Sequence, residues 1–289
     1  MRVLIAGGSG FIGTHLSRFL RDEGHEVIIV SRDPSRGISY DEVRNYIDGS
    51  TVLINLAGEN IAGRWTASKK RKIRESRLWA GRKLVDEIRK SGSKPGAFLQ
   101  ASAIGFYGRS LEGEFDEHSP PGDDFLARLV VDWENSTREL EDMGIRRVIL
   151  RIGMVLAKDG GAYPRMSFPF RFGLGGRVGS GKQWISWIHI YDLVRAVRFL
   201  MESPFSGPFN LVAPHPVRNE EFTRTLCEVL RRPCFLPVPA FILKILFGEM
   251  ADYLLLEGQR VIPRRLMEAG FQFRYPHLKE ALENLEGVD

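Results

Sequence analysis

Cysteine is scarce in this chain of 289 residues, which contains only Cys227 and Cys234. These two cysteines lie close together in the sequence without a histidine cluster, so the spacing does not indicate a zinc site. We expect two free thiols and no metal. Free thiols are typical of a reducing compartment.

Long apolar runs and basic tails are also missing. The most apolar late stretch, residues 235–248, contains two prolines and a lysine and is too short to span a bilayer. The first residues run directly into an apolar strand and leave no room for a signal-peptide cleavage region. The net charge of +5 comes without a basic–aromatic repeat. We therefore expect a cytoplasmic protein with no membrane or nucleic-acid partner. The oligomeric state stays open.

The first half of the chain alternates short apolar runs with amphipathic segments. Such alternation predicts an α/β fold, a Rossmann-type doubly wound parallel sheet. Strands are expected over residues 2–7, 26–31, 51–58, 97–103 and 146–153. Helices are expected over residues 11–24, 66–91 and 125–143.

The periodicity weakens in the second half. The glycine-rich residues 160–183 indicate a long structured loop, and residues 184–202 a strand that leads into an amphipathic helix. Prolines become frequent from about residue 212. We therefore expect a nucleotide-binding domain over residues 1–211 and a smaller substrate-side domain over residues 212–289.

A glycine motif, GGSGFIG over residues 7–13, lies between the first predicted strand and helix. Its first glycine permits a tight turn, its second lets the backbone approach a pyrophosphate, and its third lets the helix pack closely. The free N–H groups at the helix start favour a phosphate. The motif predicts a dinucleotide site, to which we assign Gly7, Ser9, Gly10, Phe11 and Ile12.

The end of the second predicted strand selects the dinucleotide. NAD-binding proteins usually have an acid there, whereas this chain has Ser31 and Arg32. A guanidinium suits a 2′-phosphate, so NADP is the expected cofactor. In the alternative interpretation, Arg32 is an exposed loop charge and Asp33 binds the ribose one residue later.

Arg77 lies on the apolar face of the predicted helix 66–91, with Ile73 four residues before it and Gly81 four after. A buried guanidinium must be paired. A cofactor phosphate is one candidate partner, and a structural carboxylate is the other.

The segments GGSGFIG, NLAGENI, SAIGFYG and SWIHIYDL together resemble an extended or atypical short-chain dehydrogenase/reductase. The C-terminal segments RRPCFLPVP, FGEMADYLLLEGQRVIPRRL and EAGFQFRYPHL resemble the branch named "epimerase family protein". The resemblance implies an NADP-type cofactor. It implies that Leu56, Ala57 and Gly58 line the adenosine side and that Val155 approaches the nicotinamide. It also implies that Ser102 is the active-site serine.

The chain departs from this superfamily at the usual Tyr-x-x-x-Lys pair. Phe125 occupies the expected tyrosine position, and Leu129 stands where the lysine is expected. The motif occurs only at Tyr275–Lys279, outside the nucleotide-binding half, where it indicates a helix start with proline at the first position.

Tyr107 is the tyrosine left near Ser102. It is either a catalytic or substrate-orienting residue or a plug in the cleft wall, because a phenol needs its pKa tuned for proton transfer. His189 is a second candidate acid–base group, although a histidine tied to Asp192 or to the backbone is the favoured interpretation.

Two functions fit these residues. The first is an NADP-dependent oxidoreductase or epimerase acting on a small carbonyl or hydroxyl substrate, with Ser102 and Tyr107 polarising the reacting oxygen. The second is a non-catalytic NADP-binding sensor or scaffold, which the absence of the usual Tyr–Lys pair favours.

Overall fold

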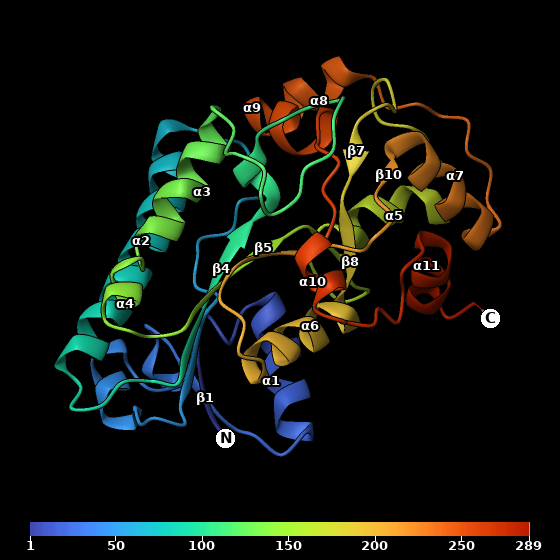
Figure 1. The fold of residues 1–289 in the computed structure, drawn as a ribbon. Coiled ribbons are helices and arrows are strands. Elements are labelled where there is room, and N and C mark those ends of the chain that lie inside the picture. Colours follow the sequence, from blue (N-terminus) through green and yellow to red (C-terminus); the bar gives the residue numbers. More distant parts are fainter. Residues whose placement is uncertain (289) are drawn as a thin grey trace.

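The structure, a computed structural model, describes residues 1–288. Its centre is a six-stranded sheet in the order β2-β1-β3-β4-β5-β9 (Figure 1). All neighbouring strands in it are parallel, which confirms the predicted Rossmann-type sheet. The strands are β1 (Arg2–Ala6), β2 (Glu26–Val30), β3 (Val52–Asn55), β4 (Ala97–Ala103), β5 (Arg147–Ile152) and β9 (Gly207–Leu211).

Helices cover both faces of the sheet. On one face, Val3 and Ile5 of β1 pack in a cluster with residues of α1 (Phe11–Asp22) and α6 (Ile190–Glu202). On the other face, Leu4 and Ala6 pack in a cluster with residues of α2 (Ala67–Lys90) and α4 (Glu139–Asp142). The helix α3 (Phe125–Asn135) lies beside α2. Successive side chains of a strand point to opposite faces, so an all-apolar strand requires both helical layers.

The strand order reverses at β1. The chain passes from β1 to β2 on one side and then returns to β3 on the other side of β1. Doubly wound sheets bind ligands at such a switch point, outside the carboxyl ends of the strands. The loops after β1, β2 and β3 therefore form the first place to look for a site.

The predicted loop over residues 160–183 is wrong in part, because it contains the helix α5 (Tyr163–Arg171). Pro164 lies in the first helical turn, where its missing N–H costs no hydrogen bond, so it did not mark a break. The helix predicted over residues 125–143 is divided into α3 and α4 near Ser136, whose hydroxyl donates to the carbonyl of Trp133. The strand β9, which completes the sheet, was not predicted.

The remaining elements lie outside the six-stranded sheet. Two small pairs are β6 (Met154–Leu156) with β8 (Trp187–His189), and β7 (Trp184–Ile185) with β10 (Val217–Arg218). The 3-10 helices are η1 (Pro34–Arg36), η2 (Tyr40–Tyr46) and η3 (Ile104–Tyr107), and η4 (Asp252–Leu256) is a π-helical turn. The C-terminal helices are α7 (Asn219–Leu230), α8 (Ala240–Phe247), α9 (Glu249–Ala251), α10 (Arg264–Glu268) and α11 (Leu278–Glu286). No helix in residues 1–288 is long and apolar enough to cross a membrane.

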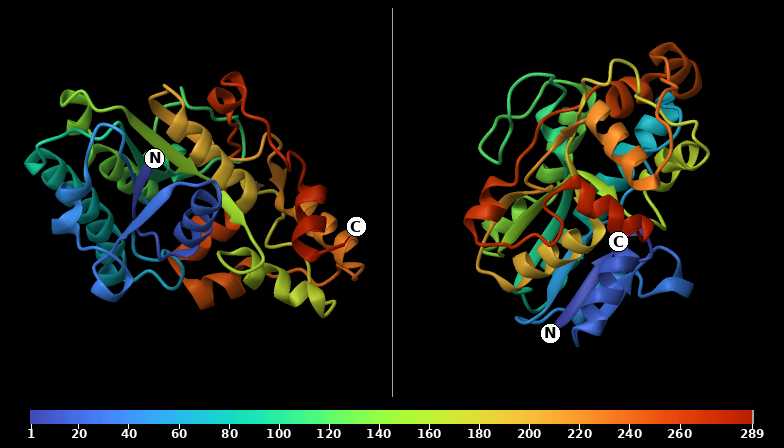
Figure 2. Two further views of the ribbon diagram at one scale, coloured as in Figure 1. Left: turned by 90° about the horizontal axis from the view of Figure 1, so that it is seen from below. Right: turned by 90° about the vertical axis from the view of Figure 1, so that its right-hand side faces the viewer.

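The predicted domain boundary follows the end of β9, but the packing crosses it in both directions. Tyr163 and Trp187, from before the boundary, share a core with Phe222 and Leu282 from α7 and α11. Figure 2 shows the yellow-green and the orange-to-red segments together at one end of the molecule. Leu266, after the boundary, packs in the core of the main sheet. The division at residue 211 stays a prediction.

The prediction of two free thiols is wrong in this structure, where Cys227 and Cys234 form a disulfide. The chain reverses at Arg231, the left-handed residue that ends α7, and this turn brings the two Cα atoms to 6.0 Å. With both cysteines in a disulfide, no free thiol in residues 1–288 indicates a reducing compartment, and cytoplasmic location stays a prediction.

Candidate active site

The glycine loop lies against the loop that follows β3. Gly7 has a φ of +78°, a conformation that favours glycine, and a Cβ built on it would lie 2.8 Å from the backbone N of Ala57. A Cβ on Gly13 would lie 2.3 Å from the carbonyl oxygen of Gly7. The structure thus brings the predicted loops 7–13 and 56–58 together at the switch point, where only glycine permits this close approach.

The N-terminus of α1 opens onto this loop without a side-chain cap. Gly10 is the N-cap residue, and the first turn contains no acidic residue. Its free N–H groups and the positive end of the helix dipole suit a phosphate. The ring of Phe11 lies close to Gly160 and Gly161, so the segment that follows β6 borders the same loop. Val155 lies in β6 itself and is buried.

Arg32 follows β2 as an exposed side chain. Asp33 is engaged elsewhere, because its carboxylate caps η1 by accepting from the N–H of Ser35 and forms an ion pair with Arg36 at 3.2 Å. The hydroxyl of Ser31 accepts from the N–H of Asp33. Asp33 would have to leave these contacts to bind a ribose, so this geometry favours Arg32 as the residue that faces the ligand.

Arg77 is a largely buried cation on α2. Its Nη1 donates to the carbonyl oxygens of Glu59 and Ile73, each at 3.0 Å. Its guanidinium carbon is 4.9 Å from the ring centroid of Trp133, and a Cβ on Gly58 would lie 3.0 Å from that carbon. Burial lowers the pKa of Arg77 to about 10. Within residues 1–288 no carboxylate lies at ion-pair distance, which disfavours a structural carboxylate as its partner.

Ser102 lies near the end of β4, but its hydroxyl does not face an open cleft. It is buried and donates to Glu134 Oε1 at 2.6 Å. Glu134 is nine residues after Phe125 on α3, about 13.5 Å further along the helix axis at the usual rise. The hydroxyl of Ser102 therefore binds α3 well away from the Phe125 position. The catalytic role of Ser102 stays a prediction, and that role would require its hydroxyl to leave Glu134.

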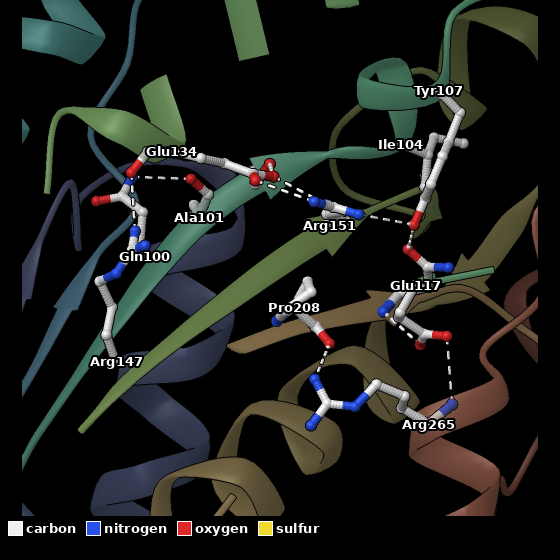
Figure 3. A network of polar contacts seen from close by, with 12 residues as sticks. Gln100, Ala101, Ile104, Tyr107, Glu117, Glu134, Arg147, Arg151, Pro208 and Arg265 are labelled. Carbon is white, nitrogen blue, oxygen red and sulfur yellow. Dashed lines mark hydrogen bonds and ion pairs between the residues drawn. The ribbon is translucent and has the colours of Figure 1, made fainter. Parts of the chain in front are cut away.

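Tyr107 is buried in the same polar network, shown in Figure 3. Its hydroxyl donates to Asn210 Oδ1 at 2.6 Å and accepts from Arg151 Nη1 at 3.1 Å. Its ring stacks on Phe115 at a centroid distance of 5.6 Å. Burial raises the pKa of Tyr107 to about 12. Its catalytic role stays a prediction, and these contacts favour the alternative interpretation of a wall residue.

Arg151 and Glu134 form the centre of this network. Arg151 binds both carboxylate oxygens of Glu134, with Nε at 2.9 Å and Nη2 at 3.0 Å. On the far side of Tyr107, the backbone N–H groups of Asn210 and Arg265 donate to the carboxylate of Glu117 at 2.9 and 3.3 Å. The network therefore joins β4, β5, β9 and α3 to the start of α10 (Figure 3).

We predict that Tyr107→Phe lowers the free energy of unfolding by about 1–3 kcal/mol, because Arg151 and Asn210 each lose a buried hydrogen-bond partner. Urea titration measures this loss, and a parallel titration should show unchanged NADPH affinity. Tyr191→Phe is the control, since Tyr191 is exposed. Unchanged stability together with a large loss of turnover would instead make Tyr107 catalytic.

Two further sequence features, His189 and the Tyr275–Lys279 motif, have contacts that fit a structural role. His189 is buried, and its Nδ1 accepts from the N–H of Tyr191 at 3.1 Å, which confirms the favoured tie to the backbone. Burial lowers the pKa of His189 to about 4. The helix near Tyr275 begins only at Leu278, so the predicted helix start at Pro276 is two residues early.

Four residues of this network were not predicted from the sequence: Glu134, Arg151, Glu117 and Asn210. A signal for Arg151 exists, since an arginine within the apolar strand RVILRI must find a buried partner. The identity of that partner depends on how α3 packs on the sheet, which the sequence does not state.

Residues 3–212 match the NAD dependent epimerase/dehydratase family, and residues 238–285 match a domain of unknown function. An epimerase family protein of Bacillus subtilis is 40% identical over 301 residues, with 99% of this chain and 98% of the relative covered.

Two solved structures extend the comparison. A human epimerase family protein, whose crystal structure is described as containing NADPH, is 41% identical with a TM-score of 0.94 and 100% of both chains covered. A nucleoside-diphosphate sugar epimerase of Corynebacterium glutamicum is 31% identical with a TM-score of 0.80, covering 100% of this chain and 59% of that one. These similarities confirm the family resemblance.

Proposed function

Because this chain belongs to the NAD-dependent epimerase/dehydratase family, we propose that it is an NADP(H)-dependent oxidoreductase or epimerase. Its substrate is a small molecule with a carbonyl or hydroxyl group. One observation carries the proposal: positive charge from Arg32, Arg77 and the N-terminus of α1 lies around the loops at the switch point of the sheet.

Three features make up this charge. The N-terminus of α1 is uncapped, Arg77 is largely buried without a carboxylate at ion-pair distance in residues 1–288, and Arg32 is exposed at the end of β2. A buried guanidinium is costly unless an anion or several acceptors compensate it. A dinucleotide with a 2′-phosphate carries anionic groups that can compensate all three, so the residues fit NADP(H).

The human relative described with NADPH supports the same cofactor for this chain. When bound, the nicotinamide accepts or supplies a hydride, which is the difficult chemical step. The residues of this chain have the simpler tasks: the 7–13 loop and Arg77 hold phosphates, Arg32 selects the 2′-phosphate, and the 56–58 loop borders the adenosine.

A non-catalytic NADP(H)-binding protein is the second candidate. It is favoured by the contacts of Ser102 and Tyr107, whose hydroxyls are both used in the buried network, and by Phe125, which cannot transfer a proton. A metabolite screen separates the two candidates if it follows both NADPH absorbance, which reports net oxidation or reduction, and the stereochemistry of each compound, which reports epimerisation without net use of cofactor. Binding of NADPH with no turnover across the screen would favour a sensor.

Arg77→Met tests the cofactor site itself. We expect the Kd for NADPH to rise about 10- to 100-fold, the loss typical of a charge-assisted hydrogen bond. The cofactor-free protein should lose less stability than this, because removing a buried charge offsets part of the lost contacts with the two carbonyl oxygens. Fluorescence titration and thermal unfolding measure the two quantities. Arg74→Met is the matched control, because Arg74 is on the same helix but is exposed and pairs with Asp132 at 2.9 Å.

The opposite result would reject the assignment. If Arg77→Met binds NADPH normally but unfolds at a much lower temperature, its contacts with the carbonyl oxygens and Trp133 are its function.

A further inference from the structure

Phe125, which the family resemblance places where a catalytic tyrosine is expected, is part of an apolar wall. Phe125, the first residue of α3, has its ring centroid 5.7 Å from that of Trp65 and 6.4 Å from that of Tyr253. These side chains come from three segments: the loop before α2, the start of α3 and the π-helical turn η4. In Figure 1, α9 lies beside the upper end of α3, so C-terminal residues approach the carboxyl edge of the sheet here.

Charged residues hold this wall in place. The guanidinium of Arg109 lies 4.2 Å from the ring centroid of Tyr253 and pairs with Asp124 at 3.2 Å. Asp124 in turn caps α3 by accepting from the N–H of Ala127 at 2.9 Å. Arg109 also pairs with Glu257 at 3.0 Å. Both sequence ends of η4 are therefore tied to the start of α3.

A lysine places its charge on this wall. Lys70, in the first turn of α2, has its Nζ 4.7 Å from the ring centroid of Phe125. The same Nζ donates to Glu249 Oε1 at 2.6 Å, and Glu249 is the first residue of α9. The side chains of Lys70 and Glu249 are 26% and 39% exposed, so the ion pair is open to a small molecule.

We propose that Lys70 is a catalytic residue that takes the place of the missing Tyr–Lys pair, with Glu249 as its positioning residue. This inference rests on the proposed function and places the reacting end of the substrate against the Phe125 wall. An ammonium group has three donors, and the two carboxylate oxygens of Glu249 use at most two of them. Another can donate to a substrate oxygen and stabilise the negative charge that develops on it. Lys70 forms and breaks no covalent bond, and water supplies the proton that completes a hydroxyl.

The substrate class follows from the surroundings of Lys70. The wall offers aromatic surface from Trp65, Phe125 and Tyr253, and the polar pair offers one cation and one carboxylate. A compound with a carbonyl or hydroxyl group beside an apolar or ring-shaped body suits this combination, because its oxygen meets Lys70 while its body covers the rings.

A spectroscopic experiment tests the placement without a known substrate. Reductive methylation with isotope-labelled methyl groups keeps each lysine positive and gives it an NMR signal, and Lys70→Arg identifies the signal of Lys70 by its disappearance. We expect this signal to move differently with NADP⁺ and with NADPH, because the two differ only in their nicotinamide rings. The signal of Lys244, an exposed lysine that pairs with Asp252, is the internal control and should respond equally to both.

A kinetic experiment adds a second readout. With any carbonyl substrate that the metabolite screen returns, Lys70→Met should lower kcat about 100-fold or more while the Kd for NADPH changes less than twofold. Lys70→Arg should restore part of the rate, and Lys244→Met should leave it unchanged.

The outcomes separate two failures. If neither NADP⁺ nor NADPH binds, the proposed function is wrong. If both bind and the signal of Lys70 responds to them identically, the proposed function stands and Lys70 does not lie at the reacting end. A Lys70→Met variant with unchanged kcat on a returned substrate overturns the inference as well.

Discussion

Arg151→Met is expected to lower the free energy of unfolding by about 3–5 kcal/mol, the range typical when one partner of a buried ion pair is removed. The expected loss is large because Arg151 compensates the carboxylate of Glu134 with two hydrogen bonds and also donates to Tyr107. Methionine fills a similar volume, so the loss reports mainly on charge and hydrogen bonding. The variant also loses the stacking of the Arg151 guanidinium, whose carbon lies 3.4 Å from the ring centroid of Phe106.

Urea titration of the cofactor-free protein measures this effect. Arg89→Met is the matched control, because Arg89 pairs with Asp86 at 2.8 Å on the surface, where such pairs contribute less than about 1 kcal/mol. The double variant Glu134→Leu with Arg151→Met should lose less stability than the sum of the single variants, since it leaves no unpaired charge behind. Additive losses would show that the two residues do not act as a pair.

This network also explains how the C-terminal segment is attached to the sheet. Glu117 lies between the backbone of β9 and the start of α10, and Asn210 donates from its amide to the carbonyl of Ile262 at 3.0 Å. Burial raises the pKa of Glu117, so its backbone donors are needed to hold the ionised form. Disruption at Arg151 is therefore expected to loosen the contact between the sheet and residues 262–265.

Most of the sheet could be predicted because its strands are apolar on both faces. β4 was predicted with the bounds that the structure has, and α2 begins one residue after Thr66, whose hydroxyl accepts from the N–H of Lys69. The helix α5 was missed because the glycines and prolines of residues 160–183 indicated a loop, although Pro164 lies in the first helical turn and the helix continues through Pro169. The strand β9 was missed because five residues with a glycine and a proline give little periodic signal.

The site was only partly predictable for a different reason. The 7–13 loop, Arg32 and Arg77 were predicted because each is recognised from residues that lie close to it in the sequence. The surroundings of Ser102 depend on register, because Ser102 is the direct neighbour of Arg151 across the β4–β5 pair. The Lys70–Glu249 pair joins residues 179 positions apart, and no spacing rule predicts such a contact.

Arg32→Asp is expected to reverse the cofactor preference of this protein. The wild-type chain should bind NADPH more tightly than NADH, because an exposed guanidinium at the end of β2 meets the 2′-phosphate with charge-assisted hydrogen bonds. The variant loses those bonds, worth about 1.5–3 kcal/mol, and adds repulsion between two anions. The Kd for NADPH should therefore rise about 100-fold, whereas a carboxylate can accept from the ribose hydroxyls of NADH and leave its Kd unchanged or lower.

Arg36→Asp is the matched control for this prediction. Arg36 is four residues away on the same exposed segment and pairs with Asp33, so its reversal changes the local field by the same two charges without removing the guanidinium that follows β2. Fluorescence titration of both variants with NADPH and NADH at one ionic strength separates a specific contact from a general field. Equal losses in the two variants would show that Arg32 contributes only through long-range charge. A wild-type protein that binds both dinucleotides equally would reject Arg32 as the selecting residue, and Asp33 would then be the residue to test at the ribose.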